Sequence, residues 1–245
     1  MRLATRLAPA LCAAALAAAC TPSQTAAPAA APAAEPTREV MTAEKQKSLT
    51  PAAVLAALKE GNRRFVEGRL TPRDYRAQAA ASAKGQYPKA VVLSCLDSRV
   101  PPEIVFDQGI GDLFVGRVAG NVEDVTMLGS MEFATKAAGA KLIVVLGHTA
   151  CGAVKGAIDR AEMGNLTALL REFDEAVGRA RKETGGPGDS SNDALVRAAT
   201  EESVRQTMSD VVSRSPVIAE LVKSGEAAVV GGVYDLATGS VTWLE

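Results

Sequence analysis

Three short runs of consecutive apolar residues, at positions 90–93, 113–115 and 142–146, stand out in the middle of the chain. Runs without polar alternation are typical of strands that are buried on both faces of a sheet. Near the C-terminus, residues 227–234 and 241–244 form two further apolar segments with a turn sequence between them. These two segments predict a terminal β-hairpin.

Between these runs, apolar residues recur at helical spacing. Thr50 is a good N-cap residue, and Pro51 fits the first turn of the helix that should follow it. Further helical segments are expected at residues 74–84, 124–138, 151–184, 192–213 and 216–223. Strands that alternate with helices predict an α/β fold, with a mostly parallel central β-sheet flanked by helices and a C-terminal β-hairpin.

The first twenty residues have a different pattern. Arg2 and Arg6 accompany an apolar run over residues 7–19, which is the layout of a secretory signal peptide. The run is shorter than the roughly 20 apolar residues of a membrane span. It ends at Cys20, as in a bacterial lipoprotein signal, and ordinary cleavage after an Ala-x-Ala triplet is an equal alternative. We therefore expect a signal peptide at residues 1–20 and an exported protein, either periplasmic or a lipoprotein of the cell envelope.

Composition divides the rest of the chain into a linker and a domain. Residues 21–45 begin with a tract of almost pure Ala, Pro, Thr and Ser, which predicts a disordered Ala/Pro-rich linker. Residues 46–245 are long enough for one compact domain with a sizeable core. The formal net charge is −1 and there is no basic stripe, so no nucleic-acid partner is expected. Contact with a membrane is expected only through a lipid on Cys20.

The predicted domain holds few sulfur and imidazole groups. Two of the four cysteines of the chain, Cys12 and Cys20, belong to the signal segment. Cys95 and Cys151 remain, together with the only histidine, His148. In an exported protein two cysteines usually form a disulfide, and that interpretation stays open. However, Cys95 follows the first predicted strand after one serine, and His148 follows the third after one glycine.

These positions favour a metal site. Ligands of such folds bind beyond the carboxyl ends of the parallel strands, where both residues are expected. Two thiolates and one imidazole form a set of three ligands that zinc accepts. The domain has no other Cys or His to close a four-ligand site, which leaves the fourth position for water or for Asp97. An open fourth position is typical of a catalytic zinc ion.

Two motifs resemble the zinc signature of the β-carbonic anhydrases: Cys-x-Asp-Ser-Arg at residues 95–99 and His-x-x-Cys-Gly at residues 148–152. The resemblance extends from about residue 50 to the end of the chain. It implies an α/β fold around a parallel sheet and one Zn²⁺ per chain. The zinc ligands that it implies are Cys95, His148 and Cys151.

The resemblance also implies the residues that act on the substrate. Asp97 and Arg99 would be the catalytic dyad, in which Asp97 accepts a hydrogen bond from the attacking oxygen. Arg99 would keep Asp97 ionised and away from the metal, and Asp97 would become the fourth zinc ligand in a closed state without that pairing. Gln86, Phe114 and Gly152 are the implied substrate-binding residues, and Gln86 would reach the site across a dimer interface.

The resemblance therefore predicts a zinc-dependent carbonic anhydrase that interconverts carbon dioxide and bicarbonate and assembles as a homodimer or homotetramer. Two alternatives stay open. One is hydrolysis of carbon disulfide or carbonyl sulfide at the same site. The other is a non-enzymatic envelope protein that binds zinc or senses redox state through Cys95 and Cys151. The presence of Asp97, Arg99 and Gln86 favours catalysis, because a site that only binds a metal needs none of them.

Overall fold

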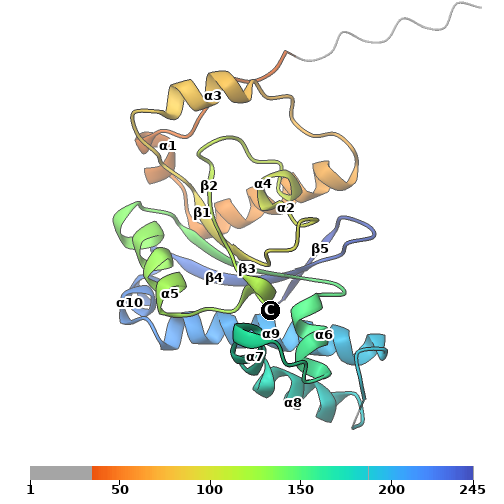
Figure 1. Ribbon diagram of the computed structural model, residues 1–245. Coiled ribbons are helices and arrows are strands. Elements are labelled where there is room, and N and C mark those ends of the chain that lie inside the picture. The colour runs from red at the N-terminus through yellow and green to blue at the C-terminus, as the bar shows by residue number, and fades with distance from the viewer. Residues whose placement is uncertain (1–34, 187, 245) are drawn as a thin grey trace, which may run out of the picture. The chain divides into compact units, whose positions relative to one another are not determined.

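The computed structural model of the protein describes residues 35–186 and 188–244. Their core is a five-stranded sheet of order β2-β1-β3-β4-β5 (Figure 1). The strands are β1 (Ala90–Ser94), β2 (Leu113–Arg117), β3 (Leu142–His148), β4 (Ala228–Tyr234) and β5 (Val241–Leu244). The first four strands pair in parallel, and β5 pairs antiparallel with β4. The predicted α/β fold and the C-terminal hairpin are therefore confirmed.

The longer helices fall within the predicted segments, whereas three short ones, at residues 43–47, 102–105 and 119–121, were not predicted. The bounds of the described helices are α1 (Ala43–Lys47), α2 (Pro51–Val66), α3 (Tyr75–Ser82), α4 (Pro102–Val105), η1 (Ala119–Asn121), α5 (Val125–Glu132), η2 (Phe133–Ala137), α6 (Gly152–Ile158), α7 (Gly164–Arg171), α8 (Asp174–Glu183), α9 (Asp193–Ser213) and α10 (Pro216–Ser224). The predicted helical region 151–184 is divided into α6, α7 and α8, which gather beside one end of α9 (Figure 1).

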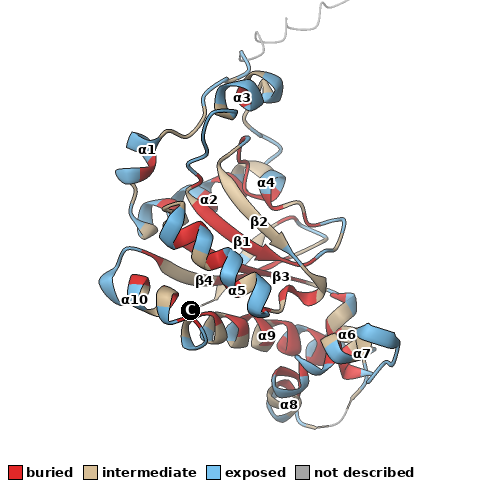
Figure 2. Ribbon diagram, turned by 60° about the vertical axis from the view of Figure 1, so that its left-hand side comes forward, coloured by how far each residue is buried: buried red, intermediate tan, exposed pale blue. Residues whose placement is uncertain are grey.

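The sheet lies between two layers of helices because successive residues of a strand point to opposite faces. Val92 of β1 belongs to the same core cluster as Leu58 of α2. Its neighbour Val91 belongs to a cluster on the other face, together with Met131 of α5 and Ile218 of α10. Every residue of β1 and β3 is buried, and both strands are red in Figure 2. Burial on both faces explains why these strands read as unbroken apolar runs.

The carboxyl ends of three strands meet at one edge of the sheet. Ser94, the last residue of β1, is aligned with Leu146 of β3 on one side and with Arg117 of β2 on the other. β3 continues two residues beyond the predicted run because Gly147 and His148 pair with β4. His148 is therefore the last residue of a strand, not a loop residue that follows one.

The predicted signal peptide and the linker up to residue 34 lie outside the described residues. Residues 35–45 of the predicted linker include an isolated bridge between Thr37 and Arg73 and most of helix α1. Within residues 35–186 and 188–244, none of the helices combines the length and the apolar character that crossing a membrane requires.

Candidate metal centre

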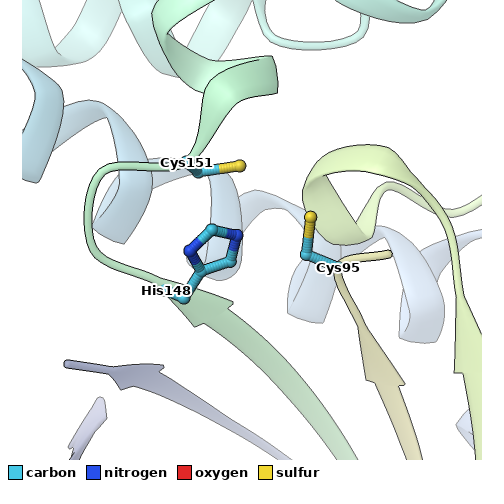
Figure 3. A group of neighbouring side chains, drawn as sticks. All are labelled: Cys95, His148 and Cys151. Atoms are coloured by element: carbon cyan, nitrogen blue, oxygen red, sulfur yellow. The ribbon is translucent and has the colours of Figure 1, made fainter. Parts of the chain in front are cut away.

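Cys95, His148 and Cys151 meet at the shared strand edge. Cys95 directly follows β1, His148 ends β3, and Cys151 is the N-cap residue of α6. Ala150 has a left-handed backbone (φ 54°), which turns the chain sharply between His148 and Cys151. The potential ligand atoms of the three side chains all lie within 4.8 Å of one another. Figure 3 shows the two sulfur atoms and the imidazole ring gathered around one space.

The imidazole of His148 is oriented to offer one nitrogen to a cation. Its Nδ1 lies 2.9 Å from the carbonyl oxygen of Thr149, and a carbonyl can only accept, so Nδ1 carries the proton. Nε2 then has a free lone pair, and it is buried without a hydrogen-bond partner among the described residues. Leaving such a group unpaired costs about 1–3 kcal/mol. A bound cation would satisfy it.

The two cysteines suit the same cation. Both are free and buried, so the disulfide alternative has no support in the structure. A hydrogen bond with the Cys151 thiol lowers the pKa of Cys95 to about 4, and the backbone N–H of Gly120, 3.3 Å from Cys95 Sγ, acts in the same direction. The same pairing, together with burial, raises the pKa of Cys151. One thiolate is thus favoured in the protein itself, and a cation would favour the second. Sulfur and imidazole nitrogen are the ligands that zinc prefers.

A carboxylate lies at the edge of the three potential ligands. Arg99 donates from Nε to Asp97 Oδ1 at 2.9 Å and from Nη2 to Asp97 Oδ2 at 2.7 Å, and its backbone N–H adds a third bond of 2.9 Å. The hydrogen bond from the guanidinium holds the pKa of Asp97 well below its usual range. Asp97 Oδ2 lies 3.8 Å from His148 Nε2. In this structure Asp97 is therefore paired with Arg99, as expected for the open state.

Gln86 and Phe114 lie away from this cluster in the same chain. Gln86 is exposed in the segment between α3 and β1. It therefore precedes the N-terminal end of β1, whereas Cys95 follows the C-terminal end. Phe114 of β2 pairs with Val91 and so lies about 13 Å from Cys95 at the usual rise per residue. The third implied substrate-binding residue, Gly152, is exposed at the start of α6, next to Cys151.

The sequence interpretation missed the contribution of the segment that follows β2. Arg117 Nε donates to the carbonyl oxygen of Cys95 at 3.0 Å, and its Nη2 donates to the carbonyl oxygen of Asp97. Gly120, the donor to Cys95 Sγ, has a left-handed backbone (φ 71°). The strand predicted at residues 113–115 could have indicated this contribution, because the carboxyl ends of parallel strands lie at the same sheet edge, where Cys95 was also expected.

The fold and the site together define a class of protein. Ligands of mixed sulfur and nitrogen chemistry, buried at the ends of parallel strands beside an ionised carboxylate, are those of a zinc-dependent α/β enzyme.

Comparisons with known proteins give the family. Residues 90–241 match the family model described as carbonic anhydrase. Carbonic anhydrase 2 of Mycobacterium tuberculosis is 41% identical over 191 residues, which are 77% of this chain and 90% of that protein. The carbonic anhydrase of Mycolicibacterium smegmatis is 40% identical over 78% of this chain and 92% of its own length. A β-carbonic anhydrase structure from Aspergillus fumigatus has a TM-score of 0.64 and 25% identity, covering 79% of this chain and 90% of that one. This chain belongs to the carbonic anhydrase family, in its β class.

Proposed function

We propose that this protein catalyses the reversible hydration of carbon dioxide to bicarbonate and a proton, with one Zn²⁺ per chain held by Cys95, His148 and Cys151. The observation that supports catalysis over metal storage is the carboxylate of Asp97, which Arg99 holds 3.8 Å from His148 Nε2. Zinc bound there would act as a Lewis acid that makes water nucleophilic near neutral pH.

Asp97 and Arg99 have separate tasks in this proposal. An ionised carboxylate only accepts hydrogen bonds, so Asp97 takes the hydrogen bond of the attacking water and orients its lone pair toward carbon dioxide. Arg99 occupies both oxygens of that carboxylate, at 2.9 and 2.7 Å, and so keeps it ionised. The same pairing would keep the carboxylate from binding the metal itself. An Asp97 side chain released from Arg99 would be free to close the site.

A second copy of the chain supplies the rest of the pocket. Gln86 and Phe114 are too far from Cys95 within one chain, so they serve the site of a partner subunit. Phe114 lines a pocket of about 500 Å³ together with Met127 and Phe133. The Phe133 side chain is 55% exposed although it packs edge-on against Phe114 at 6.0 Å. An exposed phenyl ring beside an apolar pocket is typical of an interface. β-Carbonic anhydrases of Sordaria macrospora, with a TM-score of 0.62 and 25% identity, are tetrameric.

The decisive experiment measures carbon dioxide hydration by stopped flow, together with the zinc content per chain. We expect turnover that requires about one zinc per chain and is abolished by a strong chelator. Carbon disulfide and carbonyl sulfide are assayed in parallel. Faster turnover of either sulfur compound would assign the site to that hydrolysis instead. A protein that holds zinc without any turnover would be a binding protein.

We also propose that the enzyme works in the cell envelope. The support is the signal-like pattern of residues 1–20 and the Ala/Pro-rich tract behind it. Fractionation of cells that express the full chain tests this, with labelled palmitate to detect a lipid on Cys20. A C20A variant that remains exported but loses the label would assign the lipoprotein route. Full-length, uncleaved protein confined to the cytoplasm would contradict export.

A further inference from the structure

Arg117 is an exposed arginine whose hydrogen bonds go to the backbone of the metal loop, by which we mean residues 95–99. It ends the edge strand β2, beside the end of β1. Its guanidinium donates to the carbonyl oxygens of Cys95 and Asp97, one residue on either side of Leu96. The planar fork of a guanidinium can bond two acceptors in a fixed relative orientation, which the single ammonium of lysine cannot reproduce.

Residues 95–99, the loop that Arg117 holds, form few hydrogen bonds with other segments of the described chain. β1 ends at Ser94, and the next strand-like bond is the one that Leu96 N–H donates to the Val118 carbonyl at 3.2 Å. Leu96 is 59% exposed, so it contributes little packing to this turn, whereas Cys95 beside it is buried in an apolar cluster. Arg99 holds the Asp97 carboxylate, and the Val100 N–H bonds the Asp97 carbonyl at 3.0 Å, so the bonds from the segment that follows β2 add to these local ones and connect the loop to the sheet.

We propose that Arg117 is a positioning residue that sets the relative orientation of the Cys95 sulfur and the Asp97 carboxylate. One guanidinium fixes the peptide units of both residues, so it couples the metal ligand to the group that acts on the attacking water. The part concerning Asp97 rests on the proposed function. The part concerning Cys95 rests only on the metal site. Support of this kind behind the ligands typically changes metal affinity or activity by roughly 10–100-fold.

The test compares R117M and R117K with the parent holoenzyme. R197M is the matched control, because the Arg197 side chain is 78% exposed and, among the described residues, pairs only with Glu201 on its own helix. Zinc affinity is measured by competition with a chromogenic chelator. Turnover is expressed per bound zinc, with kcat and KM separated, and Co²⁺-substituted protein reports on the thiolate ligands through its absorption spectrum. An R117A variant is also assayed with millimolar guanidinium.

For R117M we expect zinc affinity and kcat per bound zinc each to fall by about tenfold or more, with little change in KM. The Co²⁺ spectrum should shift, R117K should lie between R117M and the parent, and guanidinium should partly restore R117A. R197M should match the parent in every measurement. Zinc affinity and kcat of R117M within twofold of the parent would overturn the proposal, even with a lowered melting temperature.

If R117M does not fold, the test of the proposal rests on R117K. Zinc affinity and kcat like those of the parent in R117K would then overturn the role of the guanidinium fork. A parent without carbon dioxide hydration would refute the proposed function instead. The chelator competition and the Co²⁺ spectra would still decide whether Arg117 positions Cys95.

Discussion

Asp97 and Asp107 are both bound by arginines, yet their surroundings differ. Asp97 lies beside the metal ligands and forms its ion pair with Arg99, whose side chain is 60% exposed. Asp107 has a fully buried side chain and binds Arg64 and Arg73 far along the sequence. The first pair leaves a carboxylate available to substrate, and the second fastens segments of the fold together.

For the first aspartate, D97N should keep its zinc but lose hydration activity by roughly 100–10,000-fold, the range expected for a lost general base. The amide has nearly the same shape, but its nitrogen donates where the carboxylate only accepted. Stopped-flow assays normalised to zinc content measure the effect. Near-parent turnover per zinc would remove Asp97 from the mechanism.

For the second aspartate, D107N should lower the free energy of unfolding at pH 6 by about 3 kcal/mol, because it leaves two partly buried arginines without their anion. Burial opposes ionisation of Asp107, but hydrogen bonds from Arg73, Thr71 and Arg64 outweigh it, and the pKa is lowered. A lowered pKa stabilises the fold above the unfolded-state value of about 3.9, and that contribution is lost as the pH falls through the folded-state value.

The difference between parent and D107N should therefore shrink in acid. Urea unfolding at pH 6 and pH 3 measures it, with D174N as an exposed control. A difference that stays constant between the two pH values would show that the Asp107 charge is not what stabilises the fold.

At the level of elements, local signals predicted what local forces determine. The Thr50 side chain accepts from the Ala53 N–H at 3.2 Å and Pro51 opens α2, as their residue types indicated. The buried strands were readable because both of their faces are apolar. The ligands Cys95 and His148 were found because they stand at strand ends.

Long-range neighbours were not predictable in the same way. The order of the strands, the division of region 151–184 into three helices, and the bonds from Arg117 depend on which segments pack together. A single exposed arginine after a strand resembles any solvated surface residue. Its role emerges only once β2 is known to lie beside β1.

The 3₁₀ turn η1 is packed tightly against Phe173 and α6. A Cβ on Gly120 would lie 2.2 Å from Phe173 Cζ and 3.1 Å from Ala153 Cβ, and the backbone there has a φ of 71°. G120A should therefore lower the free energy of unfolding by about 2–4 kcal/mol, through both strain and overlap.

G178A is the matched control for G120A, since a Cβ on Gly178 of α8 meets nothing within 4 Å. It should be neutral or stabilise the helix by about 0.5–1 kcal/mol. Thermal and urea unfolding of both variants measure the difference. Equal stabilities of the two variants would show that η1 can move aside.

At the level of the whole molecule, the proposed site is divided between chains. In that proposal the ligands and the Asp97–Arg99 pair come from one chain, and Gln86 and Phe114 come from its partner. The spacing of nine residues between Gln86 and Cys95 could not separate the two groups, because it is equally compatible with contact and with distance. Only the family resemblance implied a dimer interface for Gln86. Strand β1 lies between Gln86 and Cys95 and keeps them apart within one chain.

Mixing two inactive variants tests this division. In a mixed dimer of Q86A and D97N subunits, one of the two sites combines an intact Asp97 with an intact Gln86. Random assembly of equal amounts should therefore recover about a quarter of the parent activity. Co-purification with two affinity tags isolates the mixed dimer, and the separate variants serve as controls. A mixed dimer no more active than either variant would place Gln86 outside the shared site.

The pairing of β3 with β4 has a consequence for the synthesis and folding of this protein. β4 holds β3 from Leu142 to His148, and the Tyr234 carbonyl accepts the Thr149 N–H at 2.9 Å. A nascent chain emerging from the ribosome therefore exposes Cys95, His148 and Cys151 well before β4, the partner strand of β3, is synthesised. Pairings so distant in sequence form slowly. Until the sheet is complete, the sulfurs of Cys95 and Cys151 are not buried and are accessible to oxidants and metals around the growing polypeptide.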